Sequence, residues 1–192
     1  MKNSEKTPKS IAVVASRELT EIFDNLNEDQ IEKLVDKILS AKRVFVCGAG
    51  RSMLMLRAFA MRLMHIGIDA YVVGDTITPA YGKDDLIIFG SASGETGGLV
   101  RIANTAKKIG GNIACISIFE DSSLAKLSEV TVAIKSYTDK LPESDKNKPN
   151  ILPGGSMFEI AMLILLDSMI IKLGEHTHVD TNKYFDRHAN LE

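Results

Sequence analysis

Five short apolar segments, separated by helix-compatible stretches, constrain the fold of this chain more than any other feature. They occupy residues 44–47, 70–73, 86–89, 113–116 and 130–134. Each segment is apolar throughout or nearly so, whereas a strand with one face in water alternates between polar and apolar residues. Strands of this kind are buried on both faces, as in a parallel sheet that is covered by helices.

Helical periodicity fills the intervals between these segments. Apolar residues recur at helical spacing over residues 11–26 and 31–39, and Asn27 with Gln30 resembles a capping box at the start of the second helix. Further helix-compatible segments are residues 52–66, 96–109, 122–127 and 157–173, the last of which we expect to stop at Gly174. Alternating strands and helices predict an α/β fold, a three-layer α/β/α sandwich with a five-stranded parallel sheet in the flavodoxin-like order 2-1-3-4-5.

The length of 192 residues and the hydrophobic content of 45% predict a single domain with one sizeable core. Within residues 1–192 we expect an N-terminal helical pair over 1–41, a polar, proline-containing loop over 135–153 and a C-terminal tail over 174–192. A loop of that length inside a compact domain is usually functional or mobile, and the sequence does not distinguish the two.

The net charge of −2 gives the chain no global field that would recruit nucleic acid or an acidic membrane. No secretory signal is visible, and the longest apolar run, residues 160–169, is interrupted by Asp167 and too short to cross a bilayer. Cys47 and Cys115 fall in strand segments, so we expect buried, reduced thiols. These observations predict a cytoplasmic protein without nucleic-acid or membrane partners.

Two loops rich in small residues follow the first and third strand segments. They are Gly48-Ala49-Gly50-Arg51-Ser52 and Ser91-Ala92-Ser93-Gly94-Glu95-Thr96. Each leads into a helix, whose N-terminus carries free N–H groups and partial positive charge. One such loop alone is more often a structural turn. In the order 2-1-3-4-5, however, strands one and three are neighbours at the switch point where ligands bind. The pair therefore predicts one phosphate-sized anion site, with the candidate ligands Gly48, Gly50, Arg51, Ser52, Ser91, Ser93, Gly94 and Thr96.

A dinucleotide cofactor is the weaker interpretation of the first loop. The third glycine of the fingerprint would fall at position 53, which is Met53, and the nearest acidic residue after the second strand is Asp75. A triphosphate-binding Gly-Lys-Ser/Thr sequence and a zinc-ligand spacing are also missing from the sequence. We therefore expect neither a cofactor nor a metal.

The second loop resembles the Ser-x-Ser-Gly-Glu-Thr phosphate loop of the sugar-isomerase (SIS) fold. Residues 48–52, 57–65, 72–80 and 187–192 look like the 6-phospho-3-hexuloisomerases within that fold, although Ala92 and Met53 stand where that family usually or often has glycine. The resemblance covers nearly the whole chain. It implies a metal-free isomerase that interconverts 3-hexulose 6-phosphate and fructose 6-phosphate through an enediolate, in the ribulose monophosphate pathway of formaldehyde fixation. It also implies a homotetramer, a dimer of dimers, which fits the nearly all-round apolar helix over residues 53–66.

By the same resemblance, Glu159 is the catalytic base, and His65 and His188 assist in ring opening or oxyanion stabilisation. From spacing alone, Ser156-x-x-Glu159 is a capping box, and a lone histidine at the end of an apolar helix is more often packed at an interface. Two other functions stay open: an isomerase of the same fold that acts on an arabinose or heptose phosphate, and a non-catalytic sugar-phosphate sensor. A sensor needs a DNA-binding segment, and the two N-terminal helices lack a basic recognition helix.

Overall fold

The computed structural model describes residues 7–177 and 187–191 and contains a single five-stranded sheet. Its strands are β1 (Val44–Gly48), β2 (Ala70–Val72), β3 (Leu86–Gly90), β4 (Asn112–Ser117) and β5 (Val130–Ala133). They pair in the order β2-β1-β3-β4-β5, and every neighbouring pair is parallel. Order, strand direction and strand positions confirm the prediction from the five apolar segments.

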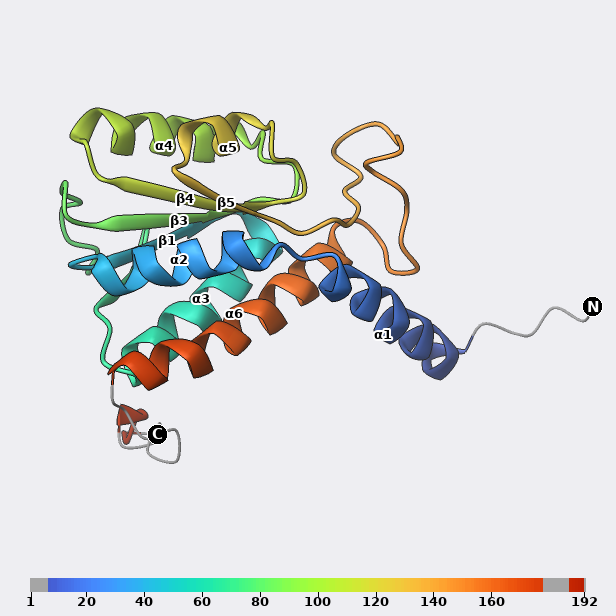
Figure 1. Cartoon of the computed structure of the whole chain (residues 1–192), viewed down its shortest axis with the longest axis horizontal. Coiled ribbons are helices and arrows are strands. Elements are labelled where there is room, and N and C mark those ends of the chain that lie inside the picture. The colour runs from blue at the N-terminus through green and yellow to red at the C-terminus, as the bar shows by residue number, and fades with distance from the viewer. Residues whose placement is uncertain (1–6, 178–186, 192) are drawn as a thin grey trace, which may run out of the picture.

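Helices cover both faces of the sheet (Figure 1). The helices are α1 (Pro8–Asp24), α2 (Glu28–Ser40), α3 (Gly50–His65), α4 (Gly97–Ile109), α5 (Ser123–Leu127) and α6 (Ser156–Thr177). Val44 and Val46 of β1 pack with α2, α3 and α6, whereas Phe45 and Cys47 pack with α4 and α5. Successive residues of one strand therefore enter two separate apolar clusters, which explains why the strand segments are apolar without alternation.

Two helix ends differ from the sequence prediction. α6 continues through Gly174 to Thr177, because Gly174 keeps a negative φ and is buried within the helix instead of ending it. At α2, Asn27 accepts a hydrogen bond from the Gln30 N–H at 3.3 Å as predicted. The Gln30 side chain does not complete a capping box, because it bonds Glu120 at 2.6 Å and accepts from the Ala133 N–H at 3.0 Å.

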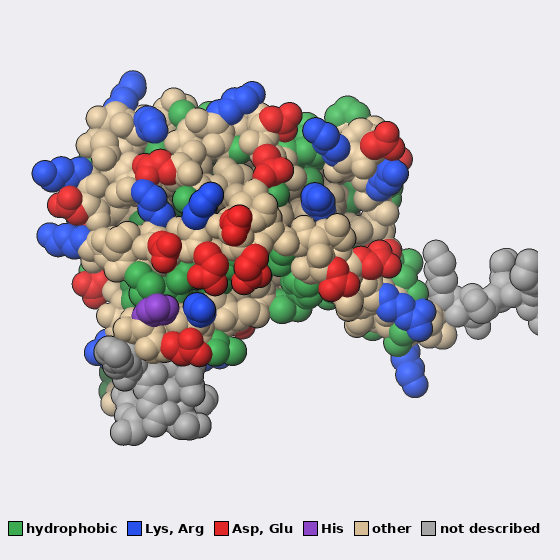
Figure 2. All heavy atoms as spheres, viewed as in Figure 1, with side chains coloured by type: hydrophobic (Ala, Val, Ile, Leu, Met, Phe, Trp, Pro, Cys, Tyr) green, Lys and Arg blue, Asp and Glu red, His purple; other side chains and the backbone are tan. Residues whose placement is uncertain are grey.

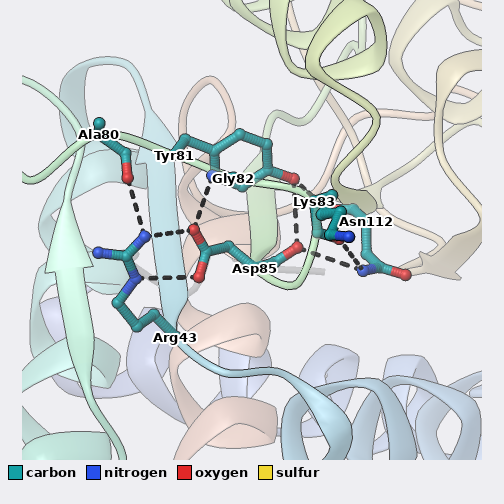
Figure 3. A network of polar contacts seen from close by, with 7 residues as sticks. All are labelled: Arg43, Ala80, Tyr81, Gly82, Lys83, Asp85 and Asn112. Carbon is teal, nitrogen blue, oxygen red and sulfur yellow. Dashed lines mark hydrogen bonds and ion pairs between the residues drawn. The ribbon is translucent and has the colours of Figure 1, made fainter.

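A buried polar network connects the amino-terminal ends of neighbouring strands of the sheet (Figure 3). Asp85 is 1% exposed, and its carboxylate accepts hydrogen bonds from Arg43 at 2.9 and 2.7 Å and from the Gly82 N–H at 2.7 Å. Burial raises the pKa of Asp85, but Arg43 and the Gly82 N–H outweigh it and hold the pKa below its ordinary value. The network lies at the opposite end of the strands from the two small-residue loops.

The surface view shows acidic and basic side chains interspersed over one face of the molecule (Figure 2). Cys47 and Cys115 are buried free thiols, as predicted, and burial raises the pKa of Cys47 to about 12. Among residues 7–177 and 187–191, no helix combines the length and the apolar content needed to cross a bilayer.

Candidate functional site

The two small-residue loops meet at a cavity of about 260 Å³ beside the carboxyl ends of β1 and β3. Gly50, Arg51 and Ser52 line it from the first loop, and Ser91 and Thr96 line it from the second. Glu159, in the first turn of α6, closes a further side. The predicted convergence of the loops at the switch point is therefore present in the fold.

Glycines at the ends of β1 and β3 let α3 approach the sheet closely. Gly48 and Gly90 are partners in the strand register. A Cβ on Gly48 would lie 3.1 Å from the Met53 backbone, and one on Gly90 would lie 3.0 Å from Leu56. The structure thus gives Gly48 a packing role behind the cavity, outside its lining, and the predicted contact of Gly48 with the substrate stays a prediction.

Helices α3 and α4, which begin beside the cavity, lack side-chain caps. The N-caps of α3 and α4 are Ala49 and Thr96, and neither makes a capping hydrogen bond through its side chain. By contrast, α1, α2 and α5 are capped by Thr7, Asn27 and Ser122. Because the first N–H groups of a helix have no partner within the helix, α3 and α4 offer theirs to an anion in the cavity.

The second loop divides into residues that face the cavity and residues that hold the loop in place. The hydroxyls of Ser91 and Thr96 lie 3.3 Å apart on the cavity side. Ser93 is buried and accepts from the Glu95 N–H at 3.2 Å, while the Glu95 carboxylate binds Ser123 at the start of α5. The Gly94 N–H donates to Ser91 within the loop. Ser93 and Gly94, predicted as substrate ligands, therefore support the loop and do not line the cavity.

Glu159 is held by the first loop and not by its own helix end. Its carboxylate lies 2.8 Å from Arg51 Nε and accepts from Ser52 Oγ at 3.4 Å. Its side chain is 13% exposed. Burial raises the pKa of Glu159, and Arg51, Ser52 and Lys140 oppose part of that rise. Among the hydrogen bonds of the described residues, none joins this carboxylate to the Ser156 N–H, so the capping-box alternative does not apply.

Thr138, Asp139 and Lys140 complete the cavity from the segment between β5 and α6. These residues belong to the polar loop predicted over 135–153, for which the sequence did not distinguish a functional role from mobility. A lysine in such a loop carries no local signal, because its position depends on contacts with residues farther along the segment.

His65 and His188 lie away from the cavity, although both belong to family-like motifs. His65 is the last residue of α3, whereas the cavity adjoins its first turn, about 20 Å away along a helix of this length. The two rings stack with centroids 5.5 Å apart, and Arg187 packs against Gly67 beside them. Burial, together with the charges of Arg62 and His188, lowers the pKa of His65. Within one chain this pair holds residues 187–191 against the end of α3, and the catalytic role of His65 and His188 stays a prediction.

The acidic residue considered above as a cofactor ligand has another partner in the structure. Asp75, the candidate ribose ligand, forms an ion pair with Arg57 of α3. Within the described part of the chain, no group of three or more histidine, cysteine, aspartate or glutamate side chains is arranged to hold a metal ion.

A family model of the SIS domain matches residues 37–145, more than half of the chain and all five strands. The chain belongs to the SIS domain family. The match confirms the resemblance inferred from the phosphate-loop motif, and Glu159 lies beyond the matched range.

Relatives of this SIS domain extend the similarity over almost the whole chain. A protein of Bacillus subtilis named 3-hexulose-6-phosphate isomerase is 38% identical, covering 97% of this chain and 100% of the relative. A protein of the same name from Mycobacterium gastri is 39% identical over 91% of this chain and 86% of the relative.

A solved structure supports the same relationship. The crystal structure of a hypothetical protein from Methanococcus jannaschii, described as inferring a 3-hexulose-6-phosphate isomerase function, is 34% identical with a TM-score of 0.78. The similarity covers 94% of this chain and 98% of that one.

Proposed function

We propose that this SIS domain isomerises 3-hexulose 6-phosphate to fructose 6-phosphate in both directions. One observation carries the proposal: a half-buried carboxylate, Glu159, faces the same cavity as the uncapped starts of α3 and α4. A base and an anion cradle within one cavity of about 260 Å³ fit a phosphorylated sugar that undergoes proton transfer. The names of the relatives supply the choice of sugar.

The cradle binds the phosphate and Glu159 moves the proton. The N–H groups at the start of α3 and α4, with Arg51, Ser91 and Thr96, receive the phosphate. Glu159 then takes the proton from C2, the electron pair forms the C2–C3 double bond, and the C3 carbonyl becomes an enediolate oxygen. The hydroxyl proton passes from O2 to O3, and Glu159 returns its proton to C3. The product carries its carbonyl at C2, and no atom is gained or lost.

The assembly we propose is a homotetramer, a dimer of dimers. Large apolar side chains are exposed along one side of α3, where Leu54, Met61 and Met64 are 58%, 46% and 41% exposed. Residues three, seven and ten positions apart share a helix face, so these side chains form a stripe that a second copy would cover. Light scattering of the wild type is expected to give four times the chain mass, and Leu54→Glu with Met61→Glu a smaller mass.

In the cell we place the chain in the cytoplasm, acting on sugar phosphate in formaldehyde fixation by the ribulose monophosphate pathway. Neither nucleic acid nor a membrane is part of the proposal. The mixed surface charge and the net charge of −2 support that choice.

A coupled assay tests the function. Purified wild type is given 3-hexulose 6-phosphate, and fructose 6-phosphate is followed through a dehydrogenase couple, with and without a chelator. We expect turnover that the chelator leaves unchanged. Faster turnover of arabinose 5-phosphate or of a heptose phosphate would reassign the substrate, and binding without turnover of any of them would indicate a sensor.

A further inference from the structure

A buried asparagine fastens the segment between β5 and α6. Asn147 is 1% exposed, and its amide nitrogen lies 2.9 to 3.0 Å from the carbonyl oxygens of Thr138, Leu141 and Pro142. Its amide oxygen accepts from the Thr138 N–H at 2.9 Å. One side chain therefore fixes the backbone over residues 138–142, and a buried amide with this many partners holds a single loop conformation.

Further contacts anchor the flanks of the same segment. Ser136 donates to Asn150 at 3.0 Å. The Ile151 N–H donates to the Glu18 carboxylate of α1, with distances of 3.0 and 3.2 Å to its two oxygens. The segment is thus cross-linked internally by Asn147 and by Ser136 with Asn150, and it is joined to α1 through Ile151.

The segment between β5 and α6 brings the cationic side chain of Lys140 to the cavity. Thr138 is 1% exposed, and its hydroxyl accepts from the Lys140 N–H at 3.3 Å, which sets the backbone from which the lysine side chain extends. Lys140 lines the cavity together with Arg51 and Glu159. In the part of the chain that the structure describes, Arg51 is paired with Glu159, whereas Lys140 has no ion-pair partner.

A cation at the reacting carbons would stabilise the charge that proton removal creates. The phosphate is received by helix N-termini and Arg51, but removal of the C2 proton leaves a second negative charge on the enediolate oxygen. A donor aimed at that oxygen lowers the barrier most, because its interaction grows as the charge develops. Asp139 faces the same cavity with the opposite charge and cannot fill this role.

We propose that Lys140 is a further catalytic residue, whose ammonium group binds the enediolate oxygen, and that Asn147 is a positioning residue that acts through Lys140. This assignment rests on the proposed isomerase function. The charge of Lys140 also acts on the base, since it is among the groups that oppose the rise in the Glu159 pKa.

The first test compares Lys140→Met with Lys146→Met. Lys146 belongs to the same segment but lines a different groove, beside the ends of β4 and β5. We expect kcat of Lys140→Met to fall about 100- to 1,000-fold, the usual effect of losing one oxyanion donor, with KM changed only a few-fold. Lys146→Met is expected to keep wild-type kcat. A Lys140→Met variant with a raised KM and unchanged kcat would place the lysine on the phosphate and overturn the assignment.

Ligand binding provides a readout that is independent of turnover. An acyclic sugar-phosphate hydroxamate mimics the planar enediolate, whereas hexitol 6-phosphate carries the phosphate and hydroxyls alone. By titration calorimetry, Lys140→Met should weaken the hydroxamate at least 10-fold more than the hexitol phosphate. Equal weakening of both ligands overturns the enediolate contact.

A double-mutant cycle tests Asn147. We expect Asn147→Ala to lower kcat, and the double variant Lys140→Met/Asn147→Ala to be no slower than Lys140→Met alone. Asn147→Asp keeps the acceptor for the Thr138 N–H and serves in the same cycle if the alanine variant does not fold. Multiplying losses in the double variant would overturn action through Lys140.

The outcomes separate this inference from the function on which it rests. A folded wild type that does not isomerise 3-hexulose 6-phosphate overturns both. Wild-type turnover that Lys140→Met retains overturns the role of Lys140 alone.

Discussion

Arg51 and Glu159 form an ion pair across the candidate site, with Arg51 Nε 2.8 Å from Glu159 Oε2. Ser52, the next residue of the same loop, donates to the other carboxylate oxygen at 3.4 Å. The loop whose N–H groups we propose to bind the substrate phosphate therefore also holds the proposed base. In the proposed mechanism, phosphate binding and proton transfer both depend on Arg51, so the pH dependence of the reaction tests the Arg51–Glu159 ion pair.

Replacing Arg51 with methionine is expected to move the acid limb of the pH profile upward. Burial raises the pKa of Glu159 and Arg51 counteracts that rise, so removing Arg51 raises the pKa further. A carboxylate base works only when ionised, so kcat/KM falls as the pH drops through this pKa, and the fall begins at higher pH in the variant. Arg57→Met is the control, because Arg57 pairs with Asp75 outside the cavity. An acid limb that moves to lower pH in Arg51→Met would contradict the effect of the Arg51–Glu159 ion pair on the pKa of Glu159.

Replacing Glu159 with glutamine keeps the side-chain size and removes the base. We expect kcat to fall at least about 100-fold, within the usual range for loss of a general base. KM should stay the same or decrease, because Arg51 no longer pairs with a carboxylate and is free for the phosphate. Steady-state kinetics of Glu159→Gln beside Glu143→Gln, an exposed position in the neighbouring loop, provide the measurement. Turnover within a few-fold of wild type would mean that another group moves the proton.

Replacing Asp85 with alanine is expected to reduce stability and spare catalysis. The substitution removes the buried carboxylate that accepts from Arg43 and the Gly82 N–H, which typically costs about 1–3 kcal/mol of unfolding free energy, because Arg43 is itself partly exposed. Because the folded-state pKa of Asp85 is lowered, its contribution is complete above the ordinary pKa of about 4 and declines as the pH falls toward the folded value. Denaturant unfolding of wild type and variant at several pH values measures this. A loss of kcat in the folded variant would mean that the network at the amino-terminal ends of the strands affects catalysis at their carboxyl ends.

The sequence predicted those features that depend on local pattern. Buried strand segments predicted the sheet, and loops after strands one and three predicted the cavity, because parallel strands place their carboxyl ends at one edge. That His65 belongs to a family-like motif did not reveal its position, because His65 lies at the far end of a helix of 16 residues from the cavity. The position of Lys140 could not be predicted from local pattern, because its backbone is set through Thr138 by a buried contact from Asn147, seven positions away. Gly174 was expected to end α6, but a glycine within a packed helix keeps helical geometry at a cost of about 1 kcal/mol.

Two glycines of the second loop and the helix that follows it provide a matched test of how the loop is built. Gly94 has φ of +66°, and an added Cβ would lie 2.1 Å from Ser122 Oγ, the atom that caps α5. Gly97, at the start of α4, has open space around its Cβ position. We expect Gly94→Ala to lose on the order of 3 kcal/mol, from the left-handed backbone and the overlap together, and Gly97→Ala to stay within about 1 kcal/mol of wild type. Chemical denaturation of both variants decides the matter. Equal losses would mean that α5 does not constrain the loop, and the supporting role assigned to Gly94 would fail.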